Sequence, residues 1–173
     1  MLTYVLKYYN DSDIRALDNG HLDGDGYTAR FHAWTGAVRE AIELIAAQPR
    51  SNGHVALIGF SQGGRLAIAS AANNPRISAL VVFYARLPAP AELNIEIRKL
   101  PPLLLLHGSA DTVVPLRDGN AIFAKAQSLG AQSEMVVYPN VGHGFDFNAD
   151  GEAAIDARRH VLSFLRSQIT PKE

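Results

Sequence analysis

Short apolar runs without polar alternation recur along this chain, each followed by a longer segment with helical spacing. The runs are Val55–Phe60, Ile77–Tyr84, Leu103–His107 and the shorter Met135–Tyr138. A strand that is apolar on both faces has to be covered on both faces, as in a parallel sheet flanked by helices. The sequence therefore predicts an α/β protein, with a mostly parallel sheet and helices on both faces.

The segments between these runs supply the helices, and the N-terminus adds a strand. Tyr4–Tyr9 is predicted to be that strand, whereas Leu87–Arg98 stays ambiguous because it is Pro-rich at first and then weakly helical. A chain of 173 residues without a linker or repeat is close to one domain, so we expect a single domain over residues 1–173. The predicted helices are Arg30–Gln48, Gly63–Ala72, Pro115–Leu129 and Glu152–Ile169.

Charge and composition argue against several classes of function. The chain has 16 Lys and Arg against 17 Asp and Glu, a formal charge of −1, which argues against a nucleic-acid or anionic-membrane surface. It has no cysteine, which excludes a disulfide framework, a thiolate metal site and a cysteine nucleophile. We see no signal peptide and no apolar run of bilayer-spanning length, and we therefore expect a cytoplasmic protein without a membrane partner.

No cofactor or metal is expected from the motifs. Neither a Walker-type phosphate loop nor a G-x-G-x-x-G turn opening a helix occurs in the sequence. The loop Asp18–Gly26 faintly resembles a calcium loop, whose twelfth position needs a bidentate carboxylate. That position is Ala29 counted from Asp18 and Trp34 counted from Asp23, so a solvated turn is expected instead.

The most specific local signal is Gly59-Phe60-Ser61-Gln62-Gly63, a G-x-S-x-G sequence between a predicted strand and a predicted helix. A serine on such a sharp turn has strained backbone geometry, and side chains two residues before and after it are expected to collide. Gly59 and Gly63 would remove those side chains. Ser61 is then an exposed candidate nucleophile, and the backbone N–H of Gln62 is a candidate oxyanion donor at the helix start.

A serine hydroxyl needs a base, and the base needs a carboxylate that orients it. Asp111 follows the strand Leu103–His107, and His143 follows the strand Met135–Tyr138 on a glycine-flanked loop. Both are expected at the C-terminal edge of the sheet, in the order Ser, acid, His. The competing interpretations are a helix N-cap for Asp111 and an ordinary surface loop for His143.

Other candidates have less suitable positions. Asp146 and Asp150 follow His143 closely and are the next choices for the acid. His54 precedes its strand, at the end away from the expected site. His107 ends its strand and is expected to buttress the acid loop.

Three blocks of the sequence resemble the catalytic blocks of the dienelactone hydrolase family of α/β-hydrolases: Val55–Gly64, Leu103–Pro115 and Tyr138–Phe145. The resemblance covers most of the chain from the first predicted strand onward. It implies hydrolysis of an ester or lactone through an acyl-enzyme. In that reaction Ser61 would be the nucleophile, His143 the base and Asp111 the residue that orients the base.

Two residue positions depart from the family pattern. The namesake enzymes use cysteine as the nucleophile, where this chain has Ser61. They also carry an arginine shortly after the catalytic histidine, whereas Gly144–Phe147 follow His143 here. The resemblance therefore implies a serine hydrolase for small carboxylic esters or lactones, and argues against dienelactone itself as the substrate.

The third departure lies at the N-terminus. Tyr4–Tyr9 resembles the family's fourth strand, so the chain is expected to be N-terminally shortened and to lack the loop that gives a second oxyanion amide. Tyr4–Tyr9 could pair with Val55–Phe60, a second chain could fill the gap, or the sequence could be a fragment. Unpaired strand edges favour association, so we expect a homodimer that involves the N-terminal strand, with modest esterase activity.

Two other readings of the function stay open. The chain could be a catalytically weak remnant that acts as a binding or self-association module through its sheet edge. It could also be a thioesterase or a peptidase-like hydrolase that uses the same three side chains.

Overall fold

The computed structural model describes residues 2–18 and 24–169. The turn predicted over Asp18–Gly26 is shorter than expected, because Asp18 ends one helix and Gly24 begins the next. Residues 19–23 lie outside the described residues, so the solvated turn there stays a prediction. In the described part, no helix is long and apolar enough to cross a membrane. The elements are α1 (Asp11–Asp18), α2 (Gly24–Ala46), β1 (Val55–Phe60), α3 (Gln62–Ala71), β2 (Ile77–Phe83), η1 (Pro90–Glu92), β3 (Leu103–Gly108), α4 (Leu116–Ser128), β4 (Ser133–Tyr138), η2 (Phe145–Phe147) and α5 (Glu152–Ile169).

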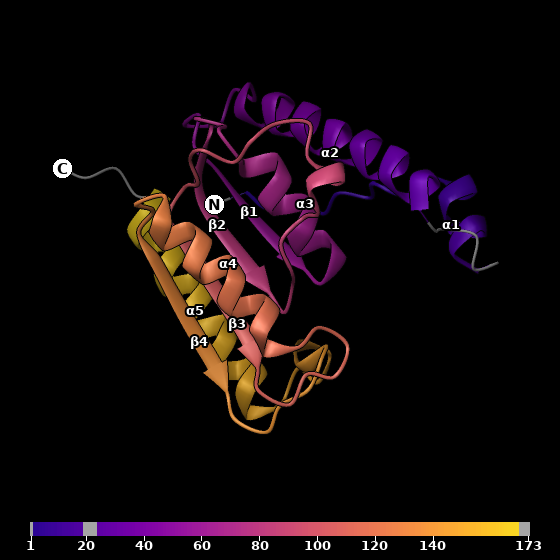
Figure 1. The fold of residues 1–173 in the computed structure, drawn as a ribbon. Helices are drawn as coiled ribbons and strands as arrows, with labels where there is room; N and C mark the ends of the chain where they lie inside the picture. Colours follow the sequence, from indigo (N-terminus) through magenta and orange to yellow (C-terminus); the bar gives the residue numbers. More distant parts are fainter. Residues whose placement is uncertain (1, 19–23, 170–173) are drawn as a thin grey trace.

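The four strands form one parallel sheet in the order β1-β2-β3-β4. Helices cover both faces, with α3 and α4 on one side and α5 on the other (Figure 1). The α/β prediction is therefore confirmed. Because every strand is parallel, the C-terminal ends of β1, β3 and β4 meet at the same edge of the sheet.

The apolar strands are explained by two separate cores. In β2, Leu80 and Val82 face the core under α2, α3 and α4, whereas Val81 and Phe83 face the core under α5. Residues 103–106 of β3 have no exposed surface at all. Burying one such leucine contributes about 1.5–3 kcal/mol, so a polar residue at any of these four positions would be costly.

The strand predicted over Tyr4–Tyr9 is wrong, as is its pairing with β1. Residues 2–10 have no regular secondary structure, and β1 is the edge of the described sheet. The aromatic residues of this segment pack on a helix instead: the ring of Tyr9 lies edge-on to Trp34 of α2 with centroids 4.9 Å apart, and Tyr8 packs beside both. The aromatic residues that made this segment resemble a strand therefore serve to pack it on α2.

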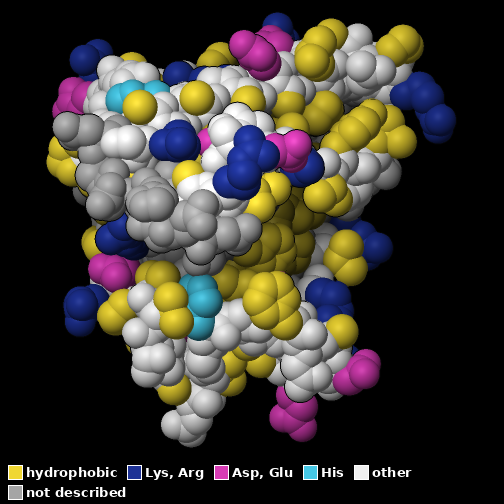
Figure 2. Space-filling model, turned by 90° about the vertical axis from the view of Figure 1, so that its right-hand side faces the viewer, with side chains coloured by type: hydrophobic (Ala, Val, Ile, Leu, Met, Phe, Trp, Pro, Cys, Tyr) yellow, Lys and Arg dark blue, Asp and Glu magenta, His cyan; other side chains and the backbone are white. Residues whose placement is uncertain are grey.

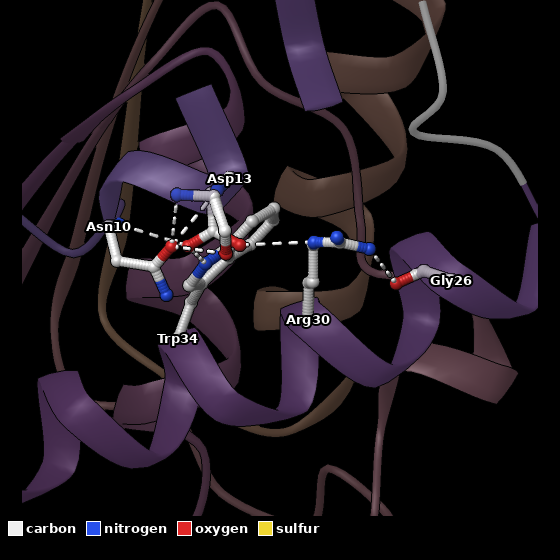
Figure 3. A network of polar contacts seen from close by, with 6 residues as sticks. Asn10, Asp13, Gly26, Arg30 and Trp34 are labelled. Carbon is white, nitrogen blue, oxygen red and sulfur yellow. Dashed lines mark hydrogen bonds and ion pairs between the residues drawn. The ribbon is translucent and has the colours of Figure 1, made fainter. Parts of the chain in front are cut away.

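Helix α1, which the sequence did not predict, is attached to α2 by one buried carboxylate (Figure 3). Asp13 is only 3% exposed, and its two oxygens accept hydrogen bonds from Arg30 Nε and Trp34 Nε1, each at 3.0 Å. Asn10 caps the helix, because its side-chain oxygen accepts the backbone N–H groups of Ser12 and Asp13. Burial raises the pKa of Asp13, but the hydrogen bonds donated to its carboxylate by the Asn10 backbone N–H, Trp34 and Arg30, together with the Arg30 charge, outweigh burial and lower the pKa.

The ambiguous segment Leu87–Arg98 contains only the short helix η1. Glu92 of η1 forms a buried ion pair with Arg65 of α3 and accepts the backbone N–H of Ala89 at 2.7 Å. Arg65 also donates to the Tyr27 hydroxyl of α2 at 2.9 Å. One buried arginine therefore holds the loop after β2 against both helices, which local sequence propensity does not reveal.

Candidate active site

Ser61 lies on a sharp turn between β1 and α3, with φ 50° and ψ −115°, a backbone conformation that residues other than glycine rarely adopt. A Cβ on Gly59 would overlap the carbonyl oxygen of Gly63, and one on Gly64 would lie 2.6 Å from the Cβ of Ala85. A Cβ on Gly63 would meet only the Tyr8 hydroxyl, at 3.9 Å. The expected collision is therefore correct for Gly59 and wrong for Gly63; Gly64 is the second glycine that the turn requires.

Three polar side chains that follow three different strands are joined by hydrogen bonds. His143 Nε2 is 3.0 Å from Ser61 Oγ, and His143 Nδ1 is 2.7 Å from Asp111 Oδ2. A carboxylate only accepts hydrogen bonds, so Nδ1 carries the proton and Nε2 is free to accept the serine hydroxyl. The arrangement can take a proton from Ser61 and stabilise the resulting imidazolium.

Asp111 is held by the backbone as well as by histidine. Its Oδ1 accepts the N–H groups of Val113 at 2.9 Å and Val114 at 2.8 Å, while its Oδ2 faces His143. The competing interpretation of Asp111 as a helix N-cap is wrong, because α4 begins at Leu116 after Pro115 and has no side-chain cap. Asp111 instead binds the turn before α4 with one oxygen and His143 with the other.

The acid loop and the histidine loop are packed directly on each other. A Cβ on Gly108 would overlap the carbonyl oxygen of Val141, which also accepts the N–H of Ala110 at 3.0 Å. The side chain of Ser109 accepts the N–H of Asn140 at 2.9 Å. Gly108 is therefore the residue that allows the two loops to approach closely enough for a hydrogen bond between their side chains.

Tyr84, which the sequence did not single out as a site residue, lies behind His143. Its ring meets the imidazole edge-on with centroids 4.5 Å apart, and its hydroxyl donates to Asp146. Burial and then this bond raise the pKa of Tyr84 above its usual value. Asp146 is therefore engaged by Tyr84, and Asp150 is exposed in the loop before α5. The available signal was the position of Tyr84 directly after a buried strand.

The start of α3 lies directly beside Ser61. Gln62 is its first residue, and the first N–H groups of a helix have no acceptor within the helix. Gln62 thus occupies the position that the sequence predicted, and the role of its N–H as an oxyanion donor stays a prediction. Among the described residues, no group of three or more His, Cys, Asp or Glu side chains could hold a metal ion.

Sequence comparison gives one family and several relatives. The profile of the dienelactone hydrolase family matches residues 21–169. A Yersinia pestis protein assigned as a carboxymethylenebutenolidase is 34% identical over 124 residues, which are 64% of this chain and 46% of that protein. Two rice proteins (Oryza sativa subsp. japonica) are 37% and 31% identical over 61% and 54% of this chain; the first is assigned as a carboxylesterase, the second as an inactive one. The chain spans less than half the length of these relatives.

Solved structures have the same fold. A Klebsiella pneumoniae protein assigned as a dienelactone hydrolase superposes with a TM-score of 0.65 at 25% identity, over 77% of this chain and 60% of that one. Esterase PE8 superposes with a TM-score of 0.61 at 26% identity, over 82% and 65% of the two chains. Esterase 2 of Thermogutta terrifontis, at 20% identity and a TM-score of 0.67 over 82% and 66%, shows the fold alone.

Proposed function

Because this chain belongs to the dienelactone hydrolase family, we propose that it is a serine hydrolase that cleaves small carboxylic esters or lactones. The observation that carries the proposal is the pair of hydrogen bonds made by His143. Its Nε2 is 3.0 Å from Ser61 Oγ, and its Nδ1 is 2.7 Å from Asp111 Oδ2. Asp111 has no exposed side-chain surface and His143 has 20%. The acid is thus shielded from water while the base stays reachable by a substrate.

The reaction would proceed by two acyl transfers. Ser61 Oγ attacks the carbonyl carbon while its proton moves to His143 Nε2, and the carbonyl oxygen becomes negative beside the Gln62 N–H. The C–O bond of the ester then breaks, and the proton on Nε2 passes to the departing alkoxide. Water, deprotonated by the same nitrogen, attacks the acyl carbon. The bond from that carbon to Ser61 Oγ then breaks, Oγ takes the proton from Nε2, and the acid is released. In a lactone, alcohol and acid remain in one molecule.

Apolar side chains beside the three residues favour an ester with an apolar part. Phe60 precedes Ser61 and is 43% exposed, Val113 on the acid loop is 68% exposed, and Phe147 on the histidine loop is 86% exposed. Figure 2 shows a hollow with a hydrophobic floor on the right-hand side of the view in Figure 1. Relatives assigned as carboxymethylenebutenolidase and carboxylesterase support a lactone or an ester as the substrate class.

The decisive test is covalent labelling by a fluorophosphonate together with hydrolysis of a short-chain p-nitrophenyl ester. We expect one adduct, on Ser61, and loss of both labelling and turnover in Ser61→Ala. Ser51→Ala, a serine in the loop before β1 and at the opposite end of that strand from Ser61, is the matched control and should keep both. An adduct on Ser109 or Ser51 with Ser61 unmodified would contradict the assignment. Parallel assays with thioester and peptide substrates distinguish the other acyl-transfer classes.

A catalytically weak binding module is the second candidate function. One relative, 31% identical, is assigned as an inactive carboxylesterase, and β1 is an edge strand that exposes Ile58 and Phe60 at 44% and 43%. Under this candidate, Ser61 resists the fluorophosphonate and the chain self-associates through β1. We propose this association for the hydrolase as well, as a homodimer formed at the β1 edge.

A further inference from the structure

His107, at the end of β3, is a buried titratable group that the proposed reaction does not use. Its side chain has no exposed surface. Its Nε2 lies 2.8 Å from the carbonyl oxygen of Val114 and 3.7 Å from Asp111 Oδ2. The imidazole therefore lies on the inner side of the same carboxylate that His143 contacts from the solvent side.

His107 and Asp111 form hydrogen bonds with the two backbone polar groups of the same residue, Val114. Val114 donates its N–H to Asp111 Oδ1 at 2.8 Å, and its carbonyl oxygen accepts the N–H of His107. The carbonyl can only accept, so the proton of His107 is on Nε2. Because the turn cannot rotate while both ends of Val114 are bonded, Oδ2 stays directed toward His143.

The other nitrogen of His107, Nδ1, is so closely packed that the ring cannot turn. Nδ1 is buried and has no hydrogen-bond partner among the described residues. It lies against Gly119 of α4, where an added Cβ would be only 2.6 Å away. The glycine therefore provides the space for the ring, and the packing of α4 on β3 holds the imidazole in one orientation.

We propose that His107 is a positioning residue, which sets the orientation of the Asp111 carboxylate and through it the proton affinity of His143. The inference rests on the proposed function only for its kinetic consequence. The geometry itself predicts that loss of the Nε2 donor loosens the turn 111–114 and weakens the bond between Asp111 and His143.

Two substitutions at position 107 separate the effect of the hydrogen-bond donor from the effect of the side chain's volume. His107→Leu keeps a buried side chain of similar size but removes the donor, whereas His107→Gln keeps an N–H that can reach Val114. We expect His107→Leu to lower kcat by up to about 10²-fold with little change in KM, because a small misplacement of a catalytic group has costs of this order. His107→Gln should recover most of the loss.

The pH profile and a double-mutant cycle distinguish positioning from mere packing. In His107→Leu the acid limb of kcat/KM should move to lower pH, because a displaced carboxylate stabilises the imidazolium less. In an Asp111→Asn background, His107→Leu should cause little further loss, since both substitutions act through the same carboxylate. An unshifted limb and additive losses would overturn the inference.

Gly119→Ala tests the inference without changing His107. Alanine favours a helix over glycine by about 1 kcal/mol, so a role of Gly119 in helix stability alone predicts an unharmed or improved protein. If the added methyl group displaces the imidazole, activity should fall and the acid limb should shift as in His107→Leu. Asn120→Ala, at the exposed neighbouring position of the same helix, is the control and should change neither.

An activity-independent measurement is the low-field proton NMR resonance of the His143 Nδ1–H, assigned by its loss in His143→Ala. We expect it to weaken or move upfield in His107→Leu and Gly119→Ala, while circular dichroism shows a folded protein. An unchanged resonance in both variants would overturn the positioning role. If the wild-type protein shows the resonance and its response but Ser61 neither labels nor turns over esters, the proposed function fails and the positioning inference stands.

Discussion

Asp111 makes two kinds of hydrogen bond, and one substitution separates them. Asparagine keeps an oxygen for the N–H groups of Val113 and Val114 but replaces the oxygen at His143 with a donor, which favours the tautomer that cannot accept the Ser61 proton. We therefore expect Asp111→Asn to fold and to lose on the order of 10⁴ in kcat. Asp146→Asn, which alters the bond to Tyr84, is the matched control and should lose far less. A large loss of kcat in Asp146→Asn alone would show that the acid is misassigned. Steady-state kinetics measure the loss in each variant, and melting curves show whether each variant is folded.

Helix α1 depends on the buried carboxylate of Asp13, which bonds Arg30 and Trp34 of α2 (Figure 3). We expect Asp13→Asn to lower the free energy of unfolding at pH 7 by about 1.5–3 kcal/mol, the range for hydrogen bonds to a charged group. The pKa of Asp13 is lowered on folding, so the stabilisation by its charge is present above pH 3.8 and is lost as the pH falls through the folded-state pKa. The difference between wild type and variant should therefore shrink at pH 3 in urea titrations. Asp11→Asn, exposed on the same helix, should show neither effect.

At the scale of the whole molecule, the free edge of β1 is the feature that predicts association. Ile58, in the middle of this edge strand, is 44% exposed, and apolar edge strands pair readily with other chains. We expect light scattering to show a dimer at micromolar concentration, and Ile58→Lys to give a monomer that still labels at Ser61. Leu44→Lys, which changes an apolar side chain on α2 that is 68% exposed, is the control and should stay dimeric. A wild-type monomer at every concentration would contradict the prediction.

How the N-terminal segment folds could not be read from its local pattern. A strand exists only when a neighbour accepts its hydrogen bonds, and Tyr4–Tyr9 finds no such neighbour in the described part of the chain. Its aromatic rings pack on Trp34 instead, and α1 is stabilised by a carboxylate whose partners lie 17 and 21 residues away. Hydrophobic periodicity describes residues only a few positions apart, so it cannot predict contacts over these sequence separations.

The sequence by itself determined the α/β class, the positions of the central strands and the turn at Ser61, because each is encoded in a local pattern of residue types: an unbroken apolar run, helical spacing or the G-x-S-x-G sequence. It also brought Asp111 and His143 to one edge, since parallel strands end together. Only the tertiary structure decided which carboxylate meets His143, because Asp146 is bound by Tyr84, a residue from another strand end. It alone decided that Gly64 and not Gly63 is sterically required, and that His107, which the sequence placed beside the acid loop, acts on it through the carbonyl group of Val114. These are distances between side chains remote in sequence, which depend on how whole elements pack.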